Sequence, residues 1–168
     1  MLRDPDPRGK VNRTRENVRA WQAGKLSVLG HSRPPNRPAR PARPKLKAPR
    51  DMPRRRKGGI AGRRAFVHAI AHIELNAIDL AWDMVARFDN PKLPRAFYDD
   101  WVRVAQDEAE HFALLSQRLI EMDVSYGDLP AHNGLWEAAN NTRHDLLARL
   151  ALVPMILEAR GLDSAPVA

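Results

Sequence analysis

Apolar residues recur at three- and four-residue spacing through the second part of the chain, and this spacing predicts helices. One helix is expected from about residue 63 to 88, where Pro91 follows closely and prevents its continuation. A second is expected over about 95–122 and a third over about 135–160. The short loop between the first two favours an antiparallel hairpin, onto which the third helix returns. No segment has the pattern of a strand, so we expect none.

The first part of the chain has a different pattern. Residues 11–24 predict one short helix, with Val11 and Trp21 near one face and Gly24 at its end. From about residue 29 to 59, seven prolines remove backbone donors and disfavour helix. We therefore expect this stretch to be extended or disordered.

Charge divides the chain in nearly the same place. Residues 1–65 contain 20 Lys and Arg against 4 Asp and Glu, whereas residues 66–168 contain 8 against 16. We therefore divide the chain into a basic Pro-rich arm with one short helix (residues 1–60) and a helical domain (residues 61–168). Such an arm can bind RNA or an acidic partner. Aromatic residues for base stacking are absent between the short helix and the first long one, so a solvated arm that wraps the bundle is the alternative.

Cysteine usage and apolar runs restrict the class of protein. The chain contains no cysteine, which excludes a disulfide framework and a thiolate metal site. Its first residues lack the apolar run of a secretory signal, and no stretch has the length and apolarity of a membrane span. We expect a soluble, cytoplasmic protein that does not bind a membrane.

An acidic residue interrupts the apolar face of the first long helix. Glu74 lies one turn from Ile70 and one turn from Ile78. The predicted apolar face consists of Val67, Ile70, Ala71, Ala77, Ile78, Ala81, Val85 and Phe88. A carboxylate in such a face costs free energy unless it is paired, protonated or bound to a metal. Glu74 is therefore a candidate site residue.

The second long helix carries a similar interruption. Glu108 and His111 are three residues apart, and so on one side of the helix, in the middle of its apolar stripe. Glu74 lies 16 residues before Asn90, and Glu108 lies 15 residues after Leu93. With a rise of about 1.5 Å per residue, the two glutamates should meet at nearly the same level of the hairpin.

Other histidines are weaker candidates. His68 and His72 are one turn apart, which a ligand pair could use, but they point away from Glu74, so we expect a flanking or surface role. We expect His132 and His144 to be loop and surface groups.

These residue types suit a pair of metal ions. Adjacent ions need several anionic oxygens to offset their charge, and imidazole adds a neutral ligand. Ferritin-like di-iron and di-manganese proteins use one Glu from each of two helices and a Glu-x-x-His from each of the other two. Glu74 and Glu158 would be the single glutamates, and Glu108 with His111 the first pair. The second pair has no counterpart before Ala168. A metal-free, hydrogen-bonded polar cluster is the alternative.

Four stretches carry a resemblance to a known family: HAIAHIELNAIDLAWDMVARF, FYDDWVRVAQDEAEHFALL, YGDLPAHNGLWEAA and LVPMILEARGLD. They resemble a ferritin-like bacterial family catalogued as domain of unknown function 455, and the Pro-rich arm is similar to that family's leader. More distantly, the chain resembles the di-iron tRNA hydroxylases that act on a modified isopentenyl-adenosine. The segment Glu158-Ala159-Arg160 is similar to one in those enzymes, whose Glu is a metal ligand.

The resemblance implies an all-α fold: a ferritin-like helical bundle with three of its four core helices present, preceded by the basic arm. It implies two iron ions in the complete fold, with manganese as the alternative, and an ancestral oxygen-dependent oxidation or hydroxylation. Glu74 and Glu158 would be ligands, Glu108 would bridge the ions, and His111 would be a terminal ligand.

The chain departs from the family in one respect. Family members continue into a fourth helix with a second motif of the Glu-x-x-His type, which this sequence lacks. We therefore expect weak or single-metal binding, little or no turnover, and association of the uncovered apolar faces, for example in a homo-oligomer. The alternative function is a non-enzymatic helical interaction module whose arm binds RNA or an acidic partner.

Overall fold

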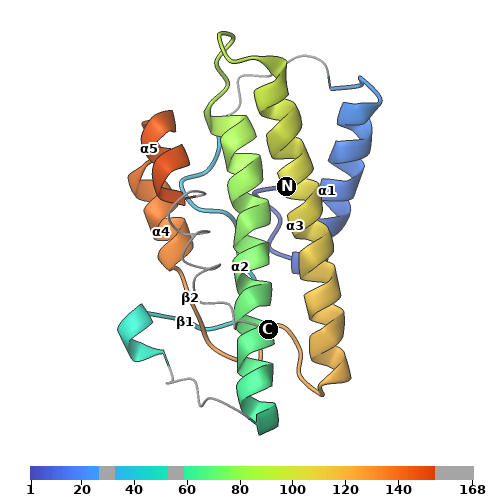
Figure 1. The fold of residues 1–168 in the computed structure, drawn as a ribbon, viewed down its shortest axis with the longest axis vertical. Helices are drawn as coiled ribbons and strands as arrows, with labels where there is room; N and C mark the ends of the chain where they lie inside the picture. The colour runs from blue at the N-terminus through green and yellow to red at the C-terminus, as the bar shows by residue number, and fades with distance from the viewer. Residues whose placement is uncertain (27–32, 53–58, 154–168) are drawn as a thin grey trace, which may run out of the picture.

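The computed structural model describes residues 1–26, 33–52 and 59–153, and these form a mostly helical fold (Figure 1). In chain order the elements are α1 (Pro7–Gln22), β1 (Leu46–Lys47), the 3-10 turn η1 (Pro49–Asp51), α2 (Gly59–Arg87), α3 (Arg95–Glu121), β2 (Ala131–His132), α4 (Gly134–Asn141) and α5 (Leu146–Leu150). Within this part of the chain, no helix combines the length and the apolarity that crossing a membrane requires.

The two long helices form the predicted hairpin. Helices α2 and α3 pack against each other more extensively than any other two elements of the described residues. The buried hydroxyl of Tyr98, in the first turn of α3, accepts a hydrogen bond from the backbone N–H of Asn90 at 3.0 Å. The same hydroxyl lies 3.0 Å from the carbonyl oxygen of Phe88. These contacts hold the turn in place, and the hairpin prediction is confirmed.

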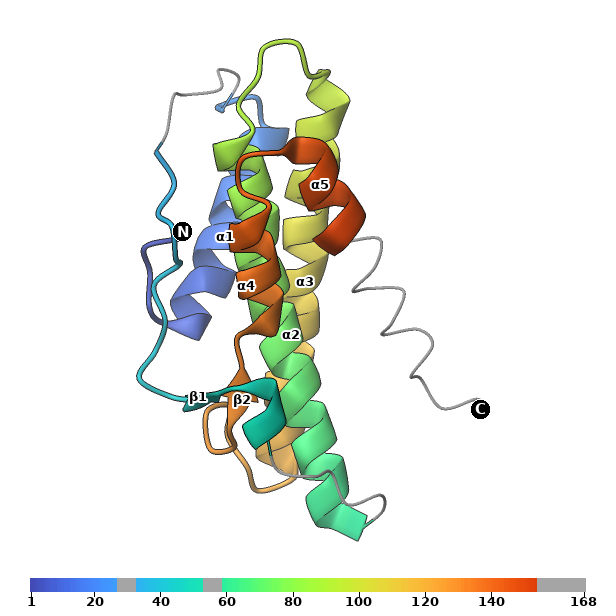
Figure 2. The same cartoon turned by 90° about the vertical axis from the view of Figure 1, so that its left-hand side faces the viewer.

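Helix α1 packs mainly against α3, on the far side of α2 from α4 and α5 (Figures 1 and 2). It begins earlier than predicted because the carboxylate of Asp6 accepts a hydrogen bond from the N–H of Gly9 at 2.8 Å and caps the helix. Val11 and Trp21 are buried, as expected for one face. Gly24 adopts a φ of 69° just beyond the helix end, a conformation that glycine adopts without strain. The first helix of the basic segment is therefore packed into the helical core.

The third predicted helix is interrupted. Its described part forms α4 and α5, separated at residues 142–145, so the expectation of one continuous helix over 135–160 was wrong there; residues 154–160 lie outside the described residues. The Asp145 carboxylate accepts a hydrogen bond from the Ala148 N–H at 3.0 Å and so starts α5. The Thr142 hydroxyl donates to a carbonyl oxygen at the end of α4. These side chains satisfy backbone groups that a break in a helix would leave unpaired.

Helix α5 is held against α2 by one buried guanidinium. Arg149 is 1% exposed and donates to Asp83 Oδ2 at 2.8 Å and to the carbonyl oxygen of Ala139 at 2.6 Å. Asp83 also accepts hydrogen bonds from Arg87. Helix α5 therefore lies beside the half of α2 that leads into the turn with α3 (Figures 1 and 2).

A short parallel pairing joins the Pro-rich segment to the body of the protein. Leu46 pairs with Ala131 and Lys47 with His132, so the expectation of no strand was wrong. Strands of two residues are too short to show an alternating pattern, and their partners lie far apart in the sequence.

Helix α2 is the central element. Every residue from Leu75 to Ala81 is buried, because α1, α3 and α4 all contact this helix. The predicted apolar face therefore left out buried residues such as Leu75 and Leu80. Four of its members are only half-buried, namely Val67, Ile70, Val85 and Phe88.

Candidate metal centre

Three of the predicted ligands meet between α2 and α3. Glu74 comes from α2, and Glu108 and His111 come from α3; one ligand atom from each lies within 4.8 Å of the other two. The Nδ1 atom of His111 lies 3.5 Å from Glu74 Oε2 and 3.4 Å from Glu108 Oε2. The prediction that the two glutamates lie at the same depth is confirmed.

Small side chains in the helix contact bring these groups together. Ala71 on α2 and Ala105 and Ala109 on α3 are fully buried. The distance between packed helices depends on the side chains at their contact, and alanines allow a close approach. Side chains of ordinary length can then meet across the α2–α3 contact at the level of Glu74 and Glu108.

The cluster lies at the edge of the helix pair. The side chains of Glu74 and Glu108 are 17% and 21% exposed, and that of His111 is 55% exposed. Two carboxylates lie within 3.5 Å of one imidazole nitrogen here. Carboxylate oxygens and an imidazole nitrogen that converge in this way are the atom types of a cation site.

The distances suit ligands around an ion. The contact of His111 Nδ1 with Glu108 Oε2 at 3.4 Å is a long hydrogen bond, since those between imidazolium and carboxylate are usually about 2.7–2.9 Å. Two atoms that each bind one metal at about 2.1 Å lie about 3.0–3.4 Å apart in octahedral or tetrahedral geometry. The separations of 3.4 and 3.5 Å from His111 Nδ1 are close to that range. Carboxylate and imidazole ligands suit iron, manganese and zinc.

Glu158, the fourth predicted ligand, lies outside the described residues. The structure therefore brings together three of the four predicted side chains and does not place the last.

A flanking or surface role was expected for His68 and His72; both are buried, so the surface role was wrong. The Nε2 of His72 donates to the carbonyl oxygen of His132 at 3.1 Å, and its Nδ1 accepts from the Tyr126 hydroxyl at 2.8 Å. The Nε2 of His68 accepts from the backbone N–H of Gly127 at 2.9 Å. Burial lowers the pKa of His72 to about 4, so this imidazole is neutral near pH 7. Both histidines hold the loop after α3 against α2, whereas His132 lies in β2 and His144 is exposed.

A second charged cluster was not predicted. Asp79 of α2 forms an ion pair with Lys10 of α1, and both side chains are 0% exposed. Arg40 lies 3.4 Å from Asp79 and also donates a hydrogen bond to Asn76. The sequence did carry an indication, because Asp79 lies between the apolar residues Ile78 and Leu80 in a stretch that is apolar on two faces. An acidic residue in such a stretch predicts a buried partner.

Comparison with known proteins gives one family. The model of the family described as "Protein of unknown function (DUF455)" matches residues 3–168. The chain belongs to this family. An uncharacterized protein of Haemophilus influenzae is 48% identical to this DUF455 member over 132 residues, which cover 76% of this chain and 46% of the relative. The chain thus spans about half the length of that relative. No solved structure matches it.

Proposed function

We propose that this DUF455 protein contributes ligands to a carboxylate-bridged two-metal centre in a ferritin-like bundle. Iron is the expected metal and manganese the alternative. The observation that carries the proposal is the meeting of Glu74, Glu108 and His111 from two helices, with ligand atoms within 4.8 Å of one another. The family resemblance of the same sequence stretches supports the same assignment.

The residues would have distinct roles. Glu108 would bridge two ions, with Glu74 as a carboxylate ligand and His111 as a terminal imidazole ligand. The carboxylates would offset the charge of the ions. Reduced iron bound there would supply activation of molecular oxygen for the oxidation or hydroxylation of a substrate.

Three side chains are fewer than a two-metal centre needs. We propose that the further ligands come from outside the described residues, with Glu158 as one and a second Glu-x-x-His pair as the others. A family member with the length of the Haemophilus influenzae relative has room for such a helix, because this chain spans only 46% of it. We expect this chain by itself to bind one ion weakly and to show little or no turnover.

Metal binding is tested with Mn²⁺, whose free form gives a strong electron paramagnetic resonance spectrum that weakens on binding. We expect one weak site in the wild-type chain. Glu108→Ala and His111→Ala should each lower its affinity about tenfold or more, since each removes a direct ligand. Competition by Fe²⁺ under argon then tests whether iron takes the same site.

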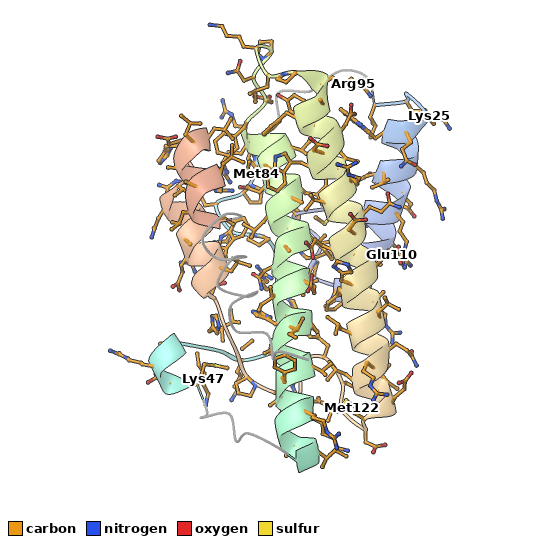
Figure 3. All side chains as sticks on the ribbon, in the orientation of Figure 1. Lys25, Lys47, Met84, Arg95, Glu110 and Met122 are labelled. Atoms are coloured by element: carbon orange, nitrogen blue, oxygen red, sulfur yellow. The ribbon has the colours of Figure 1, made fainter. Side chains whose placement is uncertain are left out.

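Glu110→Ala is the matched control. Glu110 lies on the same helix with the same charge, but it pairs with Arg15 of α1 at 2.7 Å and lies on the α1 side of α3 (Figure 3). Mn²⁺ affinity should be unchanged in this variant. Equal binding by all variants, or no binding by the wild type, would contradict the proposal. Tight binding of two irons by a monomer would contradict the expected weakness.

A second candidate function concerns the basic segment. Arg43, Lys45 and Lys47 are exposed and line a groove of about 360 Å³ against residues 127–130. Three cations outnumber the one carboxylate of the described groove lining, Asp128, and so favour an anionic partner, and we propose the phosphate backbone of RNA. The function would then be that of an interaction module.

The RNA proposal is best tested by charge reversal. Deleting the whole arm would remove α1, which is part of the core, so Lys45→Glu/Lys47→Glu is the sharper variant. Wild-type protein should shift an RNA oligonucleotide at low salt, less so at high salt, and the double variant should shift it weakly or not at all. Identical shifts by both proteins would exclude this groove as the RNA site.

A further inference from the structure

An apolar pocket of about 280 Å³ lies between α2, α3 and the segment that contains α5. Six of its lining residues come from the two long helices: Ala77, Leu80, Met84, Trp101, Val104 and Glu108. Met84 lies in the part of α2 that leads into the turn (Figure 3). Five of these six residues are apolar, and the sixth is a candidate metal ligand.

The pocket continues the candidate metal centre along the helix pair. On α3, Val104 precedes Glu108 by four residues, so the two side chains lie one turn apart on one face. On α2, Ala77 follows Glu74 by three residues, so these two side chains also lie about one turn apart on one face. Because the helices are antiparallel, the lining residues of α2 and those of α3 both extend from the cluster toward the turn. Glu108 is thus shared by the ligand cluster and the pocket.

The walls indicate which chemistry fits inside. Arg149 is the one cation among the described lining residues, and its guanidinium already donates to Asp83 and to the carbonyl oxygen of Ala139. It therefore needs no anion from a ligand. An anionic ligand would lose its hydration without gaining a partner, and the one carboxylate of the described lining, Glu108, is already assigned to the metal, whereas an uncharged apolar group gains from burial.

We propose that this pocket binds an uncharged, apolar group of the substrate and holds it beside Glu108, at the edge of the metal centre. The inference rests on the proposed metal function and adds a substrate class to it. An engineered cavity of about 150 Å³ holds benzene, so a pocket of this volume accommodates a group of roughly ten carbon atoms or fewer.

Toluene is a suitable probe, and the indole N–H resonances of the tryptophans report its position. Trp101 lines the pocket, whereas the indole N–H groups of the other three donate to protein oxygens elsewhere: Trp21 to Asp99, Trp82 to Thr14 and Trp136 to Asn36. Adding toluene to the metal-free ¹⁵N-labelled protein should shift the Trp101 resonance in a saturable way. The resonances of Trp21 and Trp82 should stay in place, whereas Trp136 packs in one cluster with the lining residue Leu80 and should shift less than Trp101. Trp101→Phe identifies the resonance.

Ala77→Phe tests the pocket by filling it. This variant should bind toluene at least about tenfold more weakly, because the added ring takes the space of the probe. Leu147→Phe is the control, since Leu147 is 77% exposed on α5 and does not line the pocket. No saturable shift of Trp101 in the wild type would overturn the inference whatever the variants do, because protein atoms would then close the pocket. Equal shifts of all four indoles would overturn it as well.

Mn²⁺ separates this inference from the metal proposal. Toluene bound beside a Mn²⁺ ion at the cluster should show faster proton relaxation, and Ala77→Phe should abolish that effect. Binding of Mn²⁺ without an effect on toluene would sink the substrate inference and leave the metal proposal intact. A Trp101 shift without Mn²⁺ binding would overturn the metal proposal and, with it, the assignment of the pocket to a substrate.

Discussion

Two of the groups of charged side chains along α2 are built in different ways. Glu74 meets Glu108 and His111 at the edge of the α2–α3 pair, where all three keep some exposure to solvent. Five residues further along, Asp79 meets Lys10 with no exposure of either side chain. In the first group two carboxylates and an imidazole converge at a partly exposed edge, whereas in the second a fully buried carboxylate pairs with Lys10 and Arg40.

This difference in charge balance separates a structural role from a ligand-binding one. Burial raises the pKa of the Asp79 carboxyl and lowers the pKa of the Lys10 ammonium, since desolvation outweighs their mutual attraction. The buried pair thus links α1 to α2, although it stabilises the fold little more than apolar residues in its place would. Removing one member alone lowers the free energy of unfolding strongly, because the other charge stays buried. A partly exposed group of ligand-type side chains such as Glu74, Glu108 and His111 is the better candidate for a cation site.

The largest effect should come from breaking the buried pair. Asp79→Ala leaves the Lys10 charge buried without its partner and should lower the free energy of unfolding by about 3–5 kcal/mol. Urea unfolding followed by circular dichroism measures the loss. Lys10→Met/Asp79→Leu, which removes both charges, should recover most of it. A single variant as stable as the wild type would show that Asp79 is not enclosed as the structure has it.

An intermediate effect is expected from pH, through the buried histidines. The pKa of His72 is lowered from 6.5 to about 4, so the unfolded chain takes up a proton at a pH where the folded protein does not. Its contribution to stability is therefore complete above about pH 6.5 and is lost as pH falls toward 4. Between pH 7 and pH 5 the loss should be about 2 kcal/mol, measured by urea unfolding at both values.

His72→Gln provides the comparison for that pH dependence. Glutamine does not titrate, so the variant should lose less stability than the wild type over the same interval, whatever its stability at pH 7. Burial also lowers the pKa of His68, which accounts for part of the remaining dependence. The same slope in both proteins would mean that His72 is not buried in its neutral form.

The smallest effect should come from the candidate metal centre. Without metal, Glu108→Gln relieves repulsion between two carboxylates that are not fully buried, and the free energy of unfolding should change by less than about 1 kcal/mol. The same unfolding assay in a metal-free buffer measures it. A loss as large as that of Asp79→Ala would indicate a structural polar cluster and weaken the metal proposal.

Some of these features follow from local sequence. Helix periodicity predicted the hairpin closely, because apolar residues at three- and four-residue spacing form one face of a regular helix. Counting residues from the turn placed Glu74 and Glu108 at one level, because every residue of a helix adds the same rise. The break between α4 and α5 did not follow, since it depends on Asp145 as a cap and on Arg149 reaching Asp83 in another helix.

The sequence by itself determined the positions of the long helices and the juxtaposition of Glu74, Glu108 and His111, since regular helix geometry and a short turn specify both. Only the tertiary structure decided which faces of α2 and α3 are covered. It thereby buried Asp79 and His72 on α2 and left His111 on α3 partly exposed to solvent. It also decided the pairing of β1 with β2 and the apolar pocket beside Glu108. These features arise where segments far apart in the chain pack together, and no local periodicity encodes which segment covers which face.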